Sequence, residues 1–418
     1  MTAETAIKLP EPARDGFEVI RHPAREHFLS RGWPTRRDES YKYTDLSSLA
    51  RREWPSPENP GATPRLPDAL GTQVLWNDGF QVASDELPAG VQALKACADS
   101  PDKALTALLG HLAPEADPVV ALNTALFDHG AWIRMPRDAR AESPLELVYA
   151  TGERDAAVAM HARLVLEMDS HSQLVLIERH AGSDADTLST RVAEIALAEG
   201  AQLLHIRLNE AGAGTYLLGD TSVRLAKDAS YQLLNLDLGA RLSREAVRVD
   251  LAGEGAHTLL KGLAVLDGKR HADADIKVMH SSGHTQSAQS FRGVLDGRSR
   301  HAYTSRVVVA EHAQKSDSSQ ESANLLLSPR AEADTRPQLE IYADDVTCNH
   351  GAATGAVDPD ALFYLQSRGV DADTARRMVA YGFAADALSE LAEDSMQHDL
   401  AMLIADRMKA PREVLEWL

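Results

Sequence analysis

A cysteine and a histidine stand two residues apart at Cys348 and His350, within the segment TCNHGA. A thiolate and an imidazole are a ligand pair that suits zinc or iron. In an extended strand, residues two apart point to the same side, so both groups could approach one site. A structural metal site normally takes four ligands, so this pair needs more ligands from other segments or from a second chain. The residues alone leave two interpretations open, a metal-related role and packing at a strand end.

No complete active site can be read elsewhere in the chain. The sequence contains no G-x-S-x-G, H-E-x-x-H or C-x-x-C motif, which excludes the usual hydrolase, metalloprotease and dithiol signatures. His280 and His284 are four residues apart, but the Ser-Ser-Gly between them predicts a turn rather than a helix. We expect solvated strand or turn positions for the histidines of this region: His257, His271, His280, His284, His301 and His312.

The charge balance limits the classes of partner. With 62 acidic and 43 basic residues, the formal net charge is -19, which opposes non-specific binding to nucleic acid. The first residues lack the basic start and apolar run of a signal peptide, and no stretch approaches 18 consecutive apolar residues. We therefore expect a cytoplasmic protein with neither a nucleic-acid nor a membrane partner. Its two cysteines, Cys97 and Cys348, should be free thiols.

The residue patterns divide the chain of 418 residues into three parts. Residues 1–130 show helical spacing interrupted by prolines, with one hairpin signal at Asn77-Asp78-Gly79, and predict a mostly helical N-terminal domain. Residues 131–350 consist of short alternating runs and predict a β core. Residues 351–418 predict a C-terminal helical domain whose first helix begins after Asp358-Pro359.

A weak internal repeat predicts how the core is built. Four segments superpose without gaps at offsets of 29, 28 and 26 residues: Met168–Leu174, Leu197–Leu203, Leu225–Tyr231 and Leu251–His257. Each ends one strand on an apolar residue, passes through a polar turn and begins the next strand. Stacked coils of a β-helix need such a unit, because neighbouring coils bury the apolar face that one coil cannot bury alone. We therefore favour a β-helix over a sandwich, with residues 291–309 read as a hairpin.

Three segments resemble the SufB/SufD family of iron-sulfur cluster assembly scaffolds. The most specific is RPQLEIYADDVTCNHGAATGAVDPDALFYLQSRGVDADTARRMVAYGFAADAL, at residues 336–388. The likeness extends upstream over residues 291–329, and YKYTDLSSL at residues 41–49 resembles the N-terminal signature of the SufD branch. The short N-terminal region and the count of two cysteines also favour that branch.

The resemblance implies a mainly β fold, in which a right-handed parallel β-helix (β-solenoid) is flanked by N-terminal and C-terminal helical domains. It implies a non-catalytic scaffold subunit that pairs with SufB through the end of the β-helix and binds the SufC ATPase through its C-terminal helices. A homodimer is a further possibility when SufB is absent.

Carried over by motif, Cys348 and His350 match the family's Cys-x-His pair at the subunit junction. His350 is then a candidate ligand of a transient iron-sulfur cluster that is shared with a SufB cysteine. The alternative from another class is a β-helix enzyme acting on polysaccharide. Such an enzyme would need clustered carboxylates and would usually have a secretion signal, and the missing signal argues against this alternative.

Overall fold

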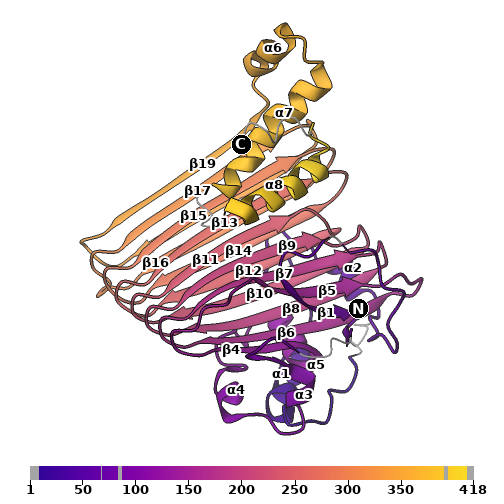
Figure 1. Cartoon of the computed structure of the whole chain (residues 1–418), viewed down its shortest axis with the longest axis vertical. Coiled ribbons are helices and arrows are strands. Elements are labelled where there is room, and N and C mark those ends of the chain that lie inside the picture. Colours follow the sequence, from indigo (N-terminus) through magenta and orange to yellow (C-terminus); the bar gives the residue numbers. More distant parts are fainter. Residues whose placement is uncertain (1–8, 67, 83–86, 390–393, 412–418) are drawn as a thin grey trace.

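The computed structural model describes residues 9–66, 68–82, 87–389 and 394–411. Its centre is a β-solenoid of about eight turns that runs between helices near both termini (Figure 1). The mainly β solenoid fold predicted from the repeat is confirmed.

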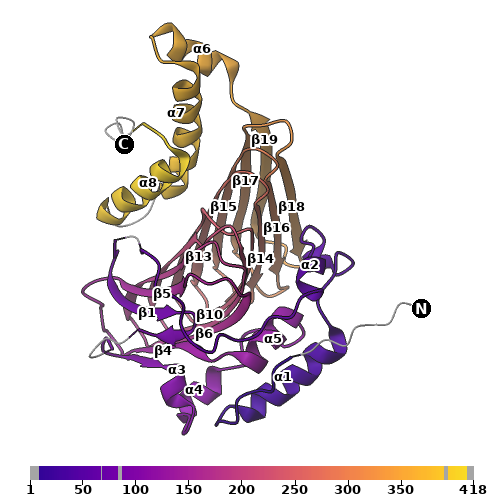
Figure 2. The same cartoon turned by 90° about the vertical axis from the view of Figure 1, so that its right-hand side faces the viewer.

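Two long sheets face each other across the solenoid (Figure 2). From β4 onward, odd-numbered strands enter the ten-stranded sheet and even-numbered strands the nine-stranded sheet, so two consecutive strands make one coil. Each of these strands pairs in parallel with the strand two places along the chain. The strand bounds are β1 Thr72–Asn77, β2 Phe80–Gln81, β3 Val91–Ala93, β4 His129–Met135, β5 Leu145–Thr151, β6 Val158–Met168, β7 Gln173–Gly182, β8 Thr187–Leu197, β9 Gln202–Glu210, β10 Thr215–Leu225, β11 Ser230–Asp237, β12 Leu242–Leu251, β13 His257–Leu266, β14 His271–His280, β15 Gln286–Leu295, β16 Arg300–Val309, β17 Asp317–Leu326, β18 Glu332–Ile341 and β19 Thr347–Ala356.

The repeat found in the sequence forms the corner at which a coil passes from the nine-stranded to the ten-stranded sheet. The apolar residues that open the four copies stack in register, from Met168 through Leu197 and Leu225 to Leu251. All four side chains belong to one buried apolar cluster between the sheets. The gapless comparison misaligns the end of the fourth copy by one residue, since Thr258 rather than His257 lies opposite Tyr231. The corner after Leu251 is one residue longer than the corner before it, so a gapless comparison could not align both ends.

One of the two predicted hairpins is present. β1 and β2 pair antiparallel around Asn77-Asp78-Gly79, as predicted. The hairpin predicted for residues 291–309 is wrong, because β15 and β16 belong to opposite sheets and pair with β17 and β18 instead. An Asp-Gly pair serves a solenoid corner as well as a hairpin turn, so the local signal did not distinguish a partner strand next in the chain from one a full coil away.

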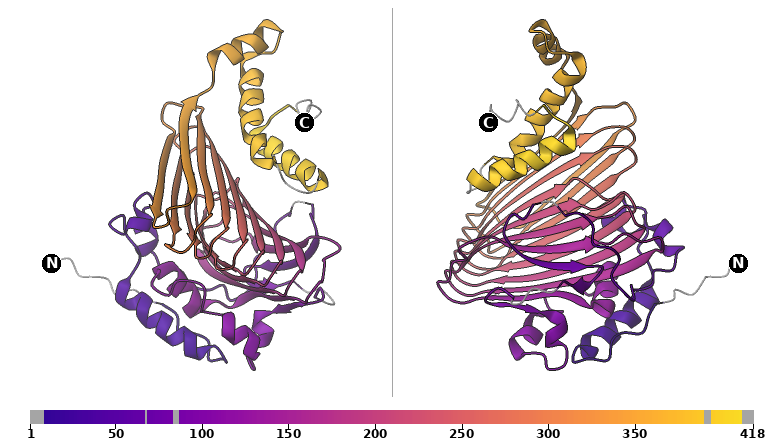
Figure 3. Two further views of the ribbon diagram at one scale, coloured as in Figure 1. Left: turned by 90° about the vertical axis from the view of Figure 1, so that its left-hand side faces the viewer. Right: turned by 45° about the vertical axis from the view of Figure 1, so that its right-hand side comes forward.

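The N-terminal helices lie against one end of the solenoid (Figure 3). Their bounds are α1 Glu18–Arg31, η1 Glu39–Tyr41, α2 Ser47–Ala50, α3 Leu94–Cys97, α4 Lys103–Leu108 and α5 Pro118–Leu126. Residues before 130 also supply β1, β2 and β3 to the two sheets. The three-domain division stays a prediction; the described strand β4 begins at His129 and β19 ends at Ala356.

The segment at residues 41–49 anchors the N-terminal region on the nine-stranded sheet. Tyr41 is buried and donates a hydrogen bond of 2.9 Å from its hydroxyl to Asp117. The guanidinium carbon of Arg244, on β12, lies 4.0 Å from the centre of the Tyr41 ring. Thr44 donates a hydrogen bond to the buried Asp273 of β14. The segment at residues 41–49 is largely polar in sequence, but its side chains pack against the solenoid.

The C-terminal helices are α6 Pro359–Ser367, α7 Ala372–Ala385, η2 Asp386–Leu388 and α8 Asp394–Met408. Helices α7 and α8 pack on the outer face of the ten-stranded sheet, where they contact β15 and β13. Their buried face includes Tyr381 and Leu400 and shares one apolar cluster with sheet residues such as Leu263. Helix α6 projects beyond the end of the solenoid (Figures 1 and 2).

Candidate functional site

Cys348 and His350 lie on β19, the last strand of the ten-stranded sheet. In the parallel register, Cys348 lies opposite Ser318 and His350 lies opposite Gln320 of β17. Both β17 side chains are buried. Since side chains alternate between the two faces of a strand, Cys348 and His350 share the register position that faces the interior.

The two candidate ligands differ in their access to solvent. Cys348 is half-buried, packs against the apolar cluster between the sheets and is a free thiol, whereas His350 is exposed. Burial raises the pKa of the Cys348 thiol, and the nearby Asp317 carboxylate raises it further. The protonated thiol is therefore favoured until a cation approaches it.

Within the described ranges, no group of three or more Cys, His, Asp or Glu side chains is placed to hold a metal ion. Cys348 and His350 thus remain a pair in this part of the chain, and their assignment as ligands stays a prediction. The expectation that two cysteines would be free is met, because Cys97 is also a free thiol, buried near the N-terminal helices.

The solenoid ends on two unpaired strand edges. β18 pairs only with β16 and β19 only with β17 among the strands that the structure describes. Each of these last strands is 10 residues long. A long open edge presents main-chain N–H and C=O groups to which a strand of another chain can add.

Polar side chains fill the interior just before this end. The Ser287 hydroxyl donates a hydrogen bond of 3.0 Å to Ser318, and it lies 2.9 Å from His280 Nε2. The other ring nitrogen of His280 lies 2.7 Å from Thr285 Oγ1. Burial lowers the pKa of His280 to about 4, so the buried ring is neutral at pH 7.

The prediction of solvated positions is wrong for two of the histidines. His280 and His301 are buried, and His301 Nδ1 lies 2.9 Å from Asn324 Oδ1. The sequence shows the alternation of side chains along each strand. Near this end the inward-facing residues are polar too, so polarity does not distinguish the inner face of a strand from the outer face. Only the stacking register reveals which set points inward.

Exposed apolar side chains occur at two places near this end. Ile341 and Tyr342, at the end of β18, are 41% and 63% exposed. Phe363 and Tyr364 on α6 are 72% and 56% exposed. Large apolar side chains are normally buried, so both places are candidate contact surfaces for partner proteins.

Two family models match this chain. The family model described as "SUF system FeS cluster assembly, SufBD core domain" matches residues 149–383, and the model of the "SufBD protein N-terminal region" matches residues 4–147. The chain belongs to the SufBD family. The resemblance predicted from residues 41–49 and 291–388 is confirmed. The SufBD family takes part in iron-sulfur cluster assembly.

Relatives from several bacteria match most of this SufBD chain. The iron-sulfur cluster assembly protein SufD of Escherichia coli is 28% identical over 391 residues, covering 92% of this chain and 91% of the relative. A SufBD family protein of Synechocystis is 26% identical, with coverage of 90% and 87%. SufD of Bacillus subtilis is 27% identical, with coverage of 70% and 67%.

Within the described residues, no helix is both long and apolar enough to cross a membrane.

Proposed function

We propose that this SufBD-family chain is a SufD-type scaffold subunit on which an iron-sulfur cluster is assembled together with a SufB-type partner. The observation that carries the proposal is the position of the Cys348/His350 pair on β19, the last strand of the solenoid, whose outer edge pairs with no strand that the structure describes. A partner strand that adds to this edge would bring its own side chains next to the pair.

The ligand chemistry supports a shared site. Thiolates and imidazoles both bind iron in clusters, and a cluster needs more ligands than this pair supplies. The SufB-type partner would supply the others, so a cluster forms only when the two chains meet. Because the cluster is cargo, the site should hold it only transiently.

We propose that the ATPase partner binds the C-terminal helices. Helix α6 contains no buried residue, while α7 and α8 fix it to the solenoid by their packing on β13 and β15. We propose that Phe363, Tyr364 and their neighbours on α6 contact a SufC-type ATPase. The chain itself is then a non-enzymatic scaffold, and ATP hydrolysis belongs to the partner.

The proposal is tested by co-expressing the chain with SufB-type and SufC-type proteins and measuring iron, sulfide and cluster absorbance after anaerobic purification. His350→Ala and Cys348→Ser should each lower cluster content several-fold while the complex stays assembled. Asn349→Ala is the matched control, because Asn349 is exposed on the opposite face of the same strand. Full cluster loading in the His350→Ala complex would refute the ligand role.

A further inference from the structure

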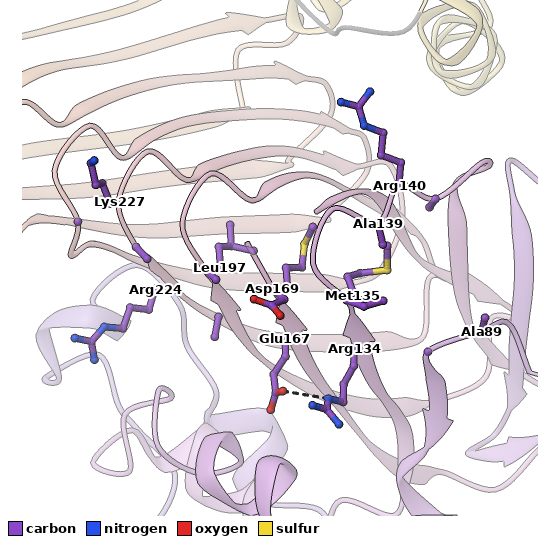
Figure 4. A pocket seen from close by; sticks show the side chains of 18 of the residues that line it. Ala89, Arg134, Met135, Ala139, Arg140, Glu167, Asp169, Leu197, Arg224 and Lys227 are labelled. Carbon is purple, nitrogen blue, oxygen red and sulfur yellow. Dashed lines mark ion pairs between the residues drawn. The ribbon is translucent and has the colours of Figure 1, made fainter. Parts of the chain in front are cut away.

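Two hollows in the solenoid differ in the charge of their lining. The larger is an open groove of about 1230 Å³ at the corner where the chain leaves the nine-stranded sheet (Figure 4). Side chains of both signs line it, and Figure 4 shows the ion pair between Arg134 and Glu167 at 3.4 Å. A lining of mixed charge selects no class of ligand. The smaller is a cavity of about 10 Å³, and among the described residues its lining includes no Asp, Glu, Lys or Arg.

Buried residues of both sheets enclose the small cavity, which we call the inter-sheet cavity. Every lining residue except Gly79 is buried. The lining residues on strands of the ten-stranded sheet include Trp76, Tyr149 and His180, and those of the nine-stranded sheet include Met160, Ser189, Thr215 and Leu217. The cavity therefore lies inside the first coils, far from β19 in the strand order, and the proposed scaffold function makes no use of it.

Three polar atoms of this lining have no hydrogen-bond partner among the residues that the structure describes. They are the Tyr149 hydroxyl, Nε2 of His180 and Oγ1 of Thr215. Tyr149 is 6% exposed, His180 3% and Thr215 1%. Buried polar groups almost always hydrogen-bond to protein or to ordered water, because an unpaired group loses its hydration without compensation. An occupant of the cavity that hydrogen-bonds to these atoms would supply that compensation.

The stacking of the rings prevents Tyr149 and His180 from bonding to each other. Their ring centres are 5.1 Å apart and their planes are 24° apart. Tyr149 also stacks on Trp76, with ring centres 5.4 Å apart. The hydroxyl oxygen and the ring nitrogen each bond in the plane of their own ring, so a direct bond would require one ring to leave the stack. Thr215 belongs to β10 of the opposite sheet.

The next residues of the same register column do find partners in the protein. His180 lies opposite Asn209, and Asn209 lies opposite Asp237. Asn209 Nδ2 donates a hydrogen bond of 2.9 Å to Asp237, and the Ser243 hydroxyl of the opposite sheet donates one of 2.6 Å to the same carboxylate. The unpartnered groups around the inter-sheet cavity are therefore a local feature of the first coils.

We infer that one water molecule occupies the inter-sheet cavity and bridges Tyr149, His180 and Thr215. A cavity of about 10 Å³ with three polar partners suits a single water molecule, and dry cavities of folded proteins are apolar. Water both donates and accepts hydrogen bonds, so it serves the two hydroxyls and either tautomer of the ring. It joins β5 and β7 of one sheet to β10 of the other.

The neutrality of the lining argues against an ion in this space. Burial lowers the pKa of His180 to about 3 and raises the pKa of Tyr149 well above its usual value. At neutral pH both groups are therefore uncharged. A buried ion without an opposite charge is costly, which disfavours a metal ion as well as an anion.

A high-resolution crystal structure of the full chain tests the inference directly. We expect one water peak in the cavity, at about 2.7–3.2 Å from each of the three polar atoms. Anomalous scattering from the same crystals should show no metal there. Crystals exposed to xenon should show no xenon in the cavity, since xenon enters dry apolar cavities. An empty cavity, a metal peak or bound xenon would overturn the inference.

Water relaxation dispersion of the full chain in solution gives a second measurement, because it reports water molecules that stay buried for long times. Tyr149→Phe with Thr215→Val removes two of the three partners, and the dispersion amplitude should fall by the contribution of one water molecule. The matched control is Thr258→Val, which removes a buried hydroxyl that donates to the Tyr231 carbonyl outside the cavity and should leave the amplitude unchanged. Circular dichroism checks that both variants fold.

An unchanged amplitude in the folded double variant, or an equal fall in the control, would contradict the bridging water. If the double variant does not fold, the crystal structure of the unaltered chain still decides the question. Both measurements use the chain without cluster or partner, so failure of the scaffold proposal leaves them unaffected.

Discussion

At the scale of residues, the solenoid interior contains a charged network that bridges the two sheets. Arg191 of β8 donates hydrogen bonds to Glu178 of β7 and, at 3.1 Å, to Glu245 of β12. His205 Nε2 lies 2.8 Å from Glu178, and all four side chains are buried. Burial alone would raise the pKa of Glu178, but Arg191 and His205 more than offset it and hold that pKa well below its usual value. The carboxylate is therefore charged at neutral pH.

Replacing Arg191 with Met should destabilise the chain by about 3–5 kcal/mol, since Glu178 and Glu245 would lose their shared buried cation. Urea denaturation of the isolated chain measures the loss. Arg298→Met, at an exposed position, should shift stability by less than about 0.5 kcal/mol. Equal stability of the two variants would show that the network contributes nothing net.

Buried histidines predict acid sensitivity. Burial lowers the pKa of His161 and His280 to about 4 and that of His180 to about 3. An unfolded chain binds protons at histidine below pH about 6.5, but the folded chain does not, so stability is present above that pH and is lost as the pH falls toward the folded values. Asp273 opposes this in part, because burial raises its pKa to about 6.

Stability should therefore fall between pH 7 and pH 5, by up to about 1.4 kcal/mol per pH unit for each such histidine. Urea midpoints measured across this range test the sign. His280→Asn removes one titrating group and should reduce the slope. A flat profile would contradict the neutral state of these rings in the fold.

At the scale of elements, each coil must leave room for the side chains of the next. Gly262 of β13 lies opposite Phe291 of β15 in the parallel register. The Phe291 ring stacks on Tyr303 with the ring centres 4.7 Å apart. A Cβ atom at Gly262 would collide with the Phe291 ring. The glycine is therefore required by packing and not by a turn.

Gly262→Ala should cost about 1–3 kcal/mol, because the buried Phe291 ring cannot shift without disturbing its stack with Tyr303. Gly351→Ala on β19 is the control, since nothing lies within 4 Å of a Cβ added there, and it should be nearly neutral. Thermal unfolding of both isolated variants compares the two. An unchanged midpoint for Gly262→Ala would mean that the coil relaxes around the added methyl group.

At the scale of the whole molecule, the open β-edge and helix α6 are two separate candidate contact surfaces for the proposed partners. Ile341 and Tyr342 mark the first, and Phe363 and Tyr364 mark the second. If each surface binds its own partner, substitutions in one surface should leave the partner of the other surface bound.

Ile341→Ser with Tyr342→Ser should weaken binding of the SufB-type chain, whereas Phe363→Ser with Tyr364→Ser should weaken binding of the ATPase only. Pull-down from a co-expressed complex, with quantified band ratios, measures both. Each double variant is the control for the other, because both replace two exposed, largely apolar side chains with serine near the β19 end of the solenoid. Loss of both partners in both variants would argue for a single combined surface.

The sequence by itself determined the solenoid and its family, and it places Cys348 two residues before His350. It could do so because the apolar residues Met168, Leu197, Leu225 and Leu251 recur once per coil, and each must stack on the next to be buried. The β1–β2 hairpin was equally predictable, since its turn and both strands are adjacent in the chain.

Only the tertiary structure decided which polar residues point inward, which strands are partners and which edges stay open. His280 and Glu178 resemble surface residues in the sequence, yet contacts between coils and across the two sheets bury them. β15 and β16 read as a hairpin, yet their partners lie a full coil away. The position of Cys348 and His350 on an edge strand is likewise a property of the stack, because β19 is an edge only since no described strand stacks beyond it.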